Sequence, residues 1–268
     1  MRVVVLVKEV LDPDAVGAYA LAGNLNVGDD GRTITQTTIP RLMNAYDEQA
    51  IEAALRLRDG GADCTIQVVS IGEDLTAILR HAMSLGADEV VAISPPEGEL
   101  DWHTVAALLA SYLESTGGAD LVFCGRQASD DDQGVVPALV GEALGMPTIT
   151  VARRVELAGS VVRVTRATPD GDEIVEADLP AVITVGSELG EPRYPTMPMK
   201  MAARKVTPTA VAAADLPVGT EGLAPRAVLS KLFVPVVSGD CEMIDGSGAA
   251  EQADRLVERL LEDKVVRP

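Results

Sequence analysis

The hydrophobic pattern of the chain alternates between short apolar runs and longer amphipathic segments. A continuous apolar run is typical of a strand buried on both faces, and a helical period of apolar positions predicts a surface helix. Strands that alternate with helices in this way predict an α/β fold, with a doubly wound, mostly parallel sheet and helices on both faces. The expected strands are residues 3–7, 64–71, 90–93, 121–124 and 179–185, and the expected helices are 47–58, 74–85, 101–114 and 135–144.

Four segments depart from this alternation of strands and helices. Residues 8–14 indicate a charged loop, and residues 22–40, rich in Gly, Asn, Asp and Thr, indicate a hairpin or surface excursion. Residues 161–168 and 173–177 alternate apolar and polar positions around Pro169-Asp170-Gly171, which predicts a hairpin with one wet face. Residues 187–205 form a proline-punctuated loop that runs into a basic helix.

The carboxyl-terminal part has a different character. Residues 206–248 show little periodicity, and a structureless tract of this length is unusual inside a compact domain. We therefore expect an arm that packs on another subunit, followed by an amphipathic helix over 249–262. The predicted organisation is an α/β domain over 1–205 and an arm with a helix over 206–268.

Composition narrows the class of protein. The net charge of −19 argues against a nucleic-acid partner, because phosphate backbones attract basic surfaces. No run is long enough to insert into a membrane, and no leader peptide is visible at Met1. Three cysteines without metal-like spacing indicate a reduced, cytoplasmic chain. The two histidines lie in helical patterns, so we expect no metal site and no histidine-based catalysis.

The stretch over 120–147 is the centre of the predicted site. A buried strand ends at Gly125, a polar turn follows, and Gly134 leads into an apolar-periodic helix that Gly145 and Pro147 stop. A helix start offers N–H groups and a positive dipole end to a ligand above the strand. An ordinary connection between a strand and a helix is the plainer interpretation of this stretch alone.

Other polar residues are expected at the same edge, where the carboxyl ends of parallel strands bind ligands in open α/β sheets. Asn44 could instead simply cap the helix that follows it. The three aspartates 130–132 are poor phosphate ligands because like charges repel, so a phosphate would meet the N–H groups of residues 133–136. We expect the site to contain Leu6, Lys8, Asn44, Ile71, Gly72, Gly125, Arg126, Gln127, Asp132, Gln133, Gly134, Val135 and Val136.

Several common chemistries find no support in the sequence. There is neither a Walker lysine motif nor GxGxxG, which argues against ATP hydrolysis and ordinary Rossmann NAD binding. No Ser-His-Asp or Cys-His set is credible, because Ser129 lacks a base and Cys124 lies in an apolar run. No catalytic residue is therefore assigned.

Two sequence motifs of the chain resemble the signatures of a known protein family. GRQASDDD in the turn and LPAVITVGSELGEPRYPTMPMKMAARK after it are similar to signatures of the electron transfer flavoprotein β subunits, and MNAYDEQAIEAALRL and SLGADEVV extend the match over nearly all of residues 1–205. The resemblance implies an adenine-nucleotide-binding sheet and a heterodimer with an α subunit that holds most of the FAD. It implies an electron carrier, not an enzyme acting alone, between acyl-CoA-type or related dehydrogenases and a membrane quinone reductase.

The resemblance also implies that the β subunit carries AMP and docks the dehydrogenase. Met197 stands where the family has an apolar anchor, and the prolines around it would hold the loop extended. The expected docking residues are Tyr194, Pro195, Met197, Pro198 and Lys200.

The identity of the nucleotide stays open at this stage. Gln133-Gly134-Val135-Val136 replaces an NQTG- or AQVG-like run that helps to hold phosphate, Gly190 replaces an asparagine, and Met199-Lys200-Met201 departs from an asparagine-isoleucine-methionine run. Asp131 resembles the AMP-binding members, whereas Tyr194-Pro195 resembles the flavin-bifurcating, NADH-oxidising members that hold a second FAD. A diphosphate would also be repelled more strongly by three carboxylates, which favours AMP. A stand-alone adenine-nucleotide-binding regulator is a further alternative, which would not need the loop or the arm.

Overall fold

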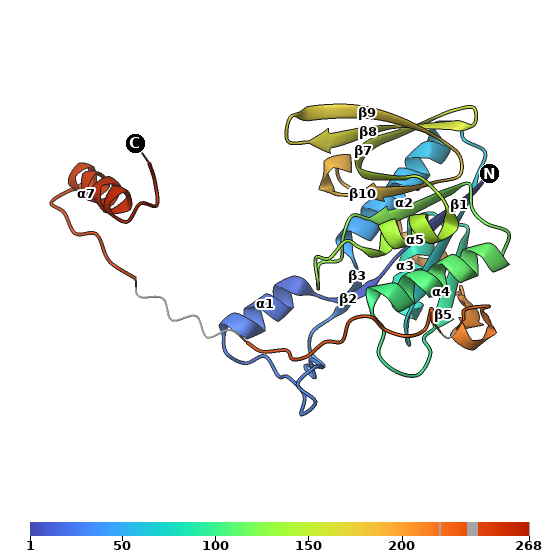
Figure 1. Cartoon of the computed structure of the whole chain (residues 1–268), viewed down its shortest axis with the longest axis horizontal. Coiled ribbons are helices and arrows are strands. Elements are labelled where there is room, and N and C mark those ends of the chain that lie inside the picture. The colour runs from blue at the N-terminus through green and yellow to red at the C-terminus, as the bar shows by residue number, and fades with distance from the viewer. Residues whose placement is uncertain (220, 235–240, 268) are drawn as a thin grey trace. The chain divides into compact units, whose positions relative to one another are not determined.

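The computed structural model describes residues 1–219, 221–234 and 241–267 and divides the chain into two compact units, Met1–Leu232 and Phe233–Pro268. The first unit is an α/β structure around one large sheet, which confirms the predicted fold class (Figure 1). Within the described ranges, no helix is long and apolar enough to cross a membrane.

The large sheet has nine strands in the order β11-β5-β4-β1-β6-β10-β7-β8-β9. Neighbours from β11 to β7 run parallel, and β7, β8 and β9 run antiparallel as an extension at one side. The strands are β1 (Arg2–Leu6), β4 (Thr65–Ile71), β5 (Glu89–Ser94), β6 (Leu121–Gly125), β7 (Thr148–Ala158), β8 (Val161–Thr168), β9 (Gly171–Asp178), β10 (Ala181–Val185) and β11 (Thr209–Ala212).

Helices cover both faces of the parallel part, as the continuous apolar runs predict. Val3 and Val5 of β1 join the core under α2 (Ala45–Asp59) and α3 (Thr76–Leu85). Val4 and Leu6 join the core under α4 (Trp102–Ser115) and α5 (Val136–Leu144). Successive residues of β1 thus pack into the two hydrophobic cores on opposite faces of the sheet. Asp101 caps α4: its carboxylate accepts a hydrogen bond from the Thr104 N–H at 2.9 Å.

The amino-terminal excursion differs in part from its prediction. The expected charged loop contains β2 (Glu9–Leu11) and the start of α1 (Pro13–Leu21), and β2 pairs with β3 (Arg41–Met43). No residue of α1 is buried, so apolar periodicity could not mark it. Residues 22–40 are an excursion in which a bridge joins Val27 and Ile34.

The carboxyl-terminal side also departs from expectation. Residues 206–232 belong to the first unit. β11 pairs with β5, and Ala213 and Leu216, which follow β11 in the chain, are buried. Further along, Asp101 accepts hydrogen bonds from the Arg226 and Ala227 N–H groups at 2.6 and 2.9 Å. The expectation of an unstructured tract is therefore wrong for this part, and residues 220 and 235–240 of the tract lie outside the described residues.

Among its described residues, the second unit contains one helix, α7 (Ala249–Glu262), at the predicted bounds. Its charged and apolar residues separate strongly onto two faces, yet none of its residues is buried. The segments Met197–Ala203 (α6) and Ser187–Leu189 (a short 3-10 turn) complete the elements that concern the site, and η2 (Ala213–Asp215) follows β11.

Candidate functional site

The rim of the sheet at the carboxyl ends of β1, β4 and β6 is the candidate site. β1 lies between the other two strands, with Leu6 opposite both Val69 and Cys124. The strand order changes direction between β1 and β6, which is the position where open α/β sheets leave a crevice for a ligand. Residues that follow these strands therefore come together here.

A buried carboxylate fixes the geometry of this rim. Asp47, in the first turn of α2, accepts hydrogen bonds from the Lys8 N–H at 2.8 Å and from the Gly125 N–H at 2.9 Å. It thereby joins the ends of β1 and β6. Burial raises the pKa of the Asp47 carboxyl to about 7. A side chain at Gly125 would meet the Asp47 carboxylate and would lie 2.9 Å from the Tyr46 Cβ, so the close approach requires glycine.

Asp47 was not among the residues expected at the site. The available signal was an acidic residue three positions after Asn44, at the start of the helix that follows the first strand. In sequence, that placement is indistinguishable from an acidic residue that only complements the helix dipole.

Asn44 connects α2 to the acidic turn instead of capping the helix. Its side-chain amide donates to the Gln127 carbonyl at 2.8 Å, and its carbonyl oxygen accepts from the Ser129 N–H at 3.2 Å. Its side chain makes no capping hydrogen bond, so the simple capping role is wrong. Asn44 is also nearly fully buried. The residue therefore holds the turn over the rim.

The acidic turn is closed by Lys8. The Lys8 Nζ lies 2.7 Å from the Asp130 Oδ1 and 3.2 Å from the Asp131 Oδ2. Burial alone would lower the pKa of Lys8, but the hydrogen bonds and charges of both aspartates raise it above its ordinary value. The single positive charge of Lys8 thus offsets one of the two negative charges of this pair, which reduces the repulsion that a phosphate group would meet.

The backbone after the turn presents N–H groups. Asp132 and Gly134 adopt positive φ angles of 52° and 62°, and a side chain at Gly134 would come within 2.7 Å of the Arg126 carbonyl. The N–H groups of Gly134, Val135 and Val136 have no acceptor among the described residues. These three donors, in succession at the start of α5, are suited to an anion such as a phosphate.

Other expected site residues have partners within the chain. The Gln133 N–H donates to the Asp131 Oδ1 at 3.2 Å, and the Gln127 side chain donates to the Asp132 Oδ1 at 2.7 Å. The N–H groups of Gly72 and Arg126 belong to the sheet, where they donate to the Ile93 and Val185 carbonyls at 3.1 and 2.7 Å. Ile71 is partly buried against the core beneath the rim.

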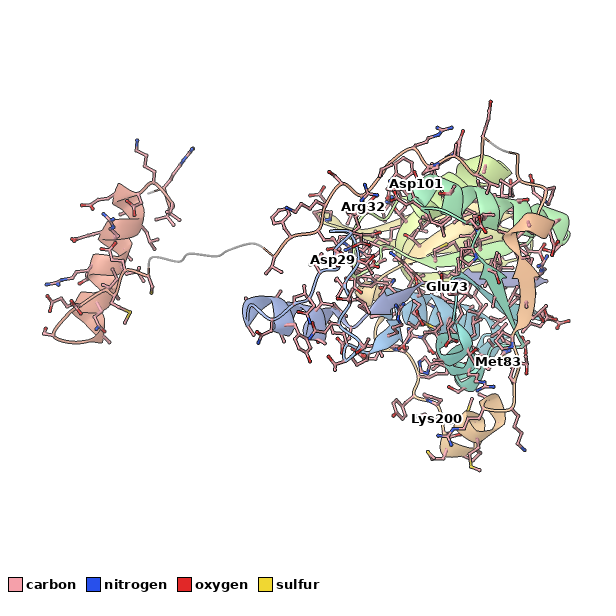
Figure 2. The ribbon with its side chains drawn as sticks, turned by 90° about the horizontal axis from the view of Figure 1, so that it is seen from below. Asp29, Arg32, Glu73, Met83, Asp101 and Lys200 are labelled. Atoms are coloured by element: carbon pink, nitrogen blue, oxygen red, sulfur yellow. The ribbon has the colours of Figure 1, made fainter. Side chains whose placement is uncertain are left out.

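The expected docking residues lie mainly on α6. Tyr194 and Met197 are 84% and 66% exposed, so Met197 does not pack in the core. The Lys200 Nζ lies 4.1 Å from the centre of the Tyr194 ring and 3.0 Å from its hydroxyl (Figure 2 labels Lys200). Pro195 is buried, and Pro198 lies in the first turn of α6. The segment from Met197 is thus helical, not extended.

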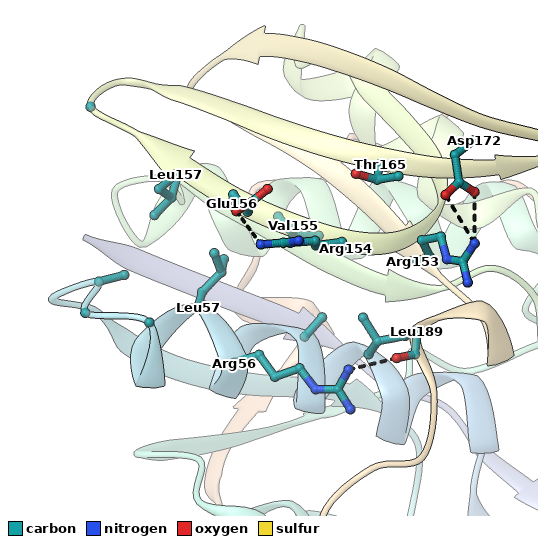
Figure 3. A pocket seen from close by; sticks show the side chains of 15 residues that line it. Arg56, Leu57, Arg153, Arg154, Val155, Glu156, Leu157, Thr165, Asp172 and Leu189 are labelled. Atoms are coloured by element: carbon teal, nitrogen blue, oxygen red, sulfur yellow. Dashed lines mark hydrogen bonds and ion pairs between the residues drawn. The ribbon is translucent and has the colours of Figure 1, made fainter.

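A separate cleft of about 1060 Å³ lies between α2 and β7, away from the rim (Figure 3). Its arginines are engaged: Arg153 pairs with Asp172 at 2.9 Å, and Arg154 pairs with Glu156 at 2.8 Å. The cleft therefore offers an anion little, whereas the rim offers unpaired N–H donors. Over the described ranges, no three His, Cys, Asp or Glu side chains are grouped to hold a metal ion, and all three cysteines are free thiols.

A parallel α/β sheet with polar turns gathered at its switch point defines a nucleotide-binding class of protein. Residues 32–216 match the family model described as the electron transfer flavoprotein domain. The electron transfer flavoprotein subunit beta of Megasphaera elsdenii is 30% identical over 99% of this chain and 100% of its own length. The subunit beta of Mycobacterium bovis is 30% identical over 99% of both chains.

A third relative, the subunit CarD of the caffeyl-CoA reductase-Etf complex of Acetobacterium woodii, is 29% identical over 99% of this chain and 100% of its own length. The chain belongs to the electron transfer flavoprotein family, as a β subunit. The resemblance drawn from its motifs is thereby confirmed, and with it a role in electron transfer.

Proposed function

We propose that the chain acts in the cytoplasm as a heterodimer with an electron transfer flavoprotein α subunit. The heterodimer would carry electrons from acyl-CoA-type or related dehydrogenases to a membrane quinone reductase. The α subunit would hold most of the FAD, and this chain would enclose it and bind AMP at the rim. The single observation that supports this best is that the N–H groups of Gly134, Val135 and Val136 find no acceptor in the described part of the chain, beside an acidic turn closed by Lys8.

The AMP phosphate would accept from those three N–H groups, and Asp132 would lie near the ribose. The backbone of Leu6 and Ile71, at the ends of adjacent strands, would border the adenine. FAD supplies the redox chemistry when it is bound. The residues of this chain would bind and orient nucleotides and would not themselves transfer electrons.

The docking surface is proposed to consist of Tyr194, Met197 and Lys200, with the further exposed methionines Met199 and Met201 on α6. Methionine side chains adapt to irregular apolar pockets, so a cluster of them suits a partner that docks briefly. Lys200 adds one positive charge at the edge of this surface.

Purification together with an α subunit tests the proposal. We expect a one-to-one heterodimer that contains FAD and accepts electrons from an acyl-CoA dehydrogenase. A chain that remains a monomer in the presence of an α subunit would contradict it.

A second candidate function is a flavin-bifurcating complex that oxidises NADH, with a second FAD in place of AMP. The pairing of Lys8 with Asp130 and Asp131 supports it, because it lowers the electrostatic cost of a diphosphate at the rim. The similarity to a subunit of a reductase complex also favours it. Rapid flavin reduction by NADH would identify this second function, whereas reduction only through a dehydrogenase supports the first.

A further inference from the structure

The segment that leads into the docking surface is attached to α2 by a buried glutamate. Glu52 is 5% exposed, and its Oε2 accepts hydrogen bonds from the backbone N–H of Arg193 at 3.2 Å and from its side-chain Nε at 2.7 Å. The Arg193 Nη2 also donates to the Asp59 Oδ2 at 2.7 Å. One side chain thus holds both the backbone and the side chain of the residue just before Tyr194.

Arg56, one turn along the same helix, holds the residues before Arg193. Its guanidinium donates to the Leu189 carbonyl at 2.7 Å (Figure 3). It also donates to the Glu191 carbonyl at 3.0 Å, and its Nε pairs with the Glu52 Oε1 at 2.8 Å. A planar guanidinium can reach two carbonyls and a carboxylate at once, which a lysine cannot.

The far side of the docking helix is held as well. The Arg80 Nε of α3 donates to the Val206 carbonyl at 2.9 Å, three residues beyond the end of α6. The exposed residues of α6 are therefore carried by a segment with fixed attachments on both sides. A docking element that is already ordered loses less conformational entropy when its partner binds.

The cluster of Glu52, Asp59, Arg56 and Arg193 contains two carboxylates and two guanidinium groups, so its charges balance. Burial alone would raise the pKa of Glu52, but the hydrogen bonds from Arg193 and Arg56 hold it below its ordinary value. The hydrogen bond to Glu52 in turn raises the pKa of Arg193. The cluster therefore stays ionised at neutral pH, and loss of one member leaves a buried charge without its partner.

We propose that Glu52 and Arg56 are positioning residues for dehydrogenase docking, which fix residues 189–193 and thereby the orientation of Tyr194 and α6. The inference rests on the proposed docking function of α6. It also gives a physical role to the Glu-Pro-Arg sequence of residues 191–193, whose arginine anchors the surface and does not form part of it.

The test uses the heterodimer with its FAD, and Arg56→Lys is the principal variant. The lysine keeps the positive charge beside Glu52 but cannot reach both carbonyls. We expect the KM for the dehydrogenase to rise about threefold to tenfold, equivalent to the loss of one hydrogen bond, with kcat, FAD content and melting temperature unchanged. Trypsin should also cleave faster after Arg193 or Lys200.

Glu52→Gln should raise the KM further and should also lower the melting temperature, because Arg56 and Arg193 then lose their buried carboxylate partner. Arg154→Ala, which removes an exposed ion pair on β7, should change neither the KM nor the rate of trypsin cleavage. If Met197→Ala raises KM while Arg56→Lys and Glu52→Gln leave both KM and trypsin cleavage unchanged, the positioning role is overturned. If Met197→Ala itself leaves KM unchanged, the docking surface is wrong and the inference falls with it.

Discussion

At the scale of single residues, the ionic state of the acidic turn depends on Lys8. Asp130 and Asp131 would repel a phosphate if they stood alone, but the Lys8 ammonium pairs with both and offsets one of their two negative charges. The same pairing is half exposed, so it adds little to the stability of the fold itself. Its main consequence is for an anionic ligand.

Replacement of Lys8 by alanine should therefore weaken nucleotide binding more than it weakens the fold. We expect the affinity of the nucleotide-free heterodimer for AMP to fall at least about tenfold, because two uncompensated carboxylates then face the phosphate. The free energy of unfolding should change by less than about 1 kcal/mol. Calorimetric titration with AMP measures the first quantity, and unchanged affinity would mean that the phosphate lies elsewhere.

Asp47 gives a prediction about pH. Its folded pKa of about 7 lies above the ordinary value of 3.8, so the folded state binds the proton more tightly than the unfolded state does. The stabilisation by Asp47 is complete below about pH 4 and is lost as pH rises to about 7. Against Asp47→Asn, the wild-type chain should lose on the order of a few kcal/mol of relative stability over that range. Urea unfolding at several pH values measures it, and parallel pH profiles would contradict it.

The sequence predicts several site residues but not their contacts. The loop 125–136 and Lys8 could be placed at the rim because the carboxyl ends of parallel strands share one edge. The amide of Asn44 could bond its own helix or a distant turn, and local sequence does not distinguish the two. The hydrogen bonds from Gly125 to Asp47 and from Arg193 to Glu52 join residues that are far apart in the chain, so only the folded structure reveals them.

At the scale of elements, α6 is the docking candidate. Met197 begins the helix with most of its side chain exposed, beside the Tyr194–Lys200 pair. Met197→Ala should weaken docking of the dehydrogenase by roughly 1–3 kcal/mol, because it removes a central apolar contact. FAD content and heterodimer formation should be unchanged.

A matched control for this variant is Ile174→Ala. Ile174 of β9 is 67% exposed, as Met197 is 66%, but it lies on the antiparallel extension. The control should leave electron transfer intact. Loss of FAD in Met197→Ala, or an equal loss of transfer in Ile174→Ala, would count against the assignment of α6.

The elements that the sequence predicted correctly are those whose burial leaves a pattern. The central strands, α2 to α5 and the β8–β9 hairpin follow apolar runs or alternation. Five elements were missed. α1 buries no residue, and β7 has a mixed burial pattern. β11 is a short edge strand that pairs with distant β5, and the short strands β2 and β3 pair with each other. Pairing between distant segments has no local signal.

At the scale of the whole molecule, the second unit carries apolar side chains that are not buried within it. Phe233 and Met243 are 74% and 79% exposed, and α7 buries none of its residues. Exposed apolar surface of this kind marks an interface or an aggregation risk. We propose that the α subunit covers it.

The chain produced alone should therefore aggregate or lose its carboxyl-terminal part to proteases, and an α subunit should prevent both. Light scattering and limited proteolysis, with and without the partner, measure this. A stable, flavin-free monomer with a protected tail would contradict the prediction.

We propose above all that this β subunit holds an adenine nucleotide of its own at the rim, in addition to the FAD of the heterodimer. The most direct test is to denature the purified heterodimer and to quantify the released nucleotides by chromatography. We expect one FAD and one AMP per heterodimer. Two FAD without AMP would replace the proposed function with the bifurcating one, and one FAD without any second nucleotide would contradict the site itself.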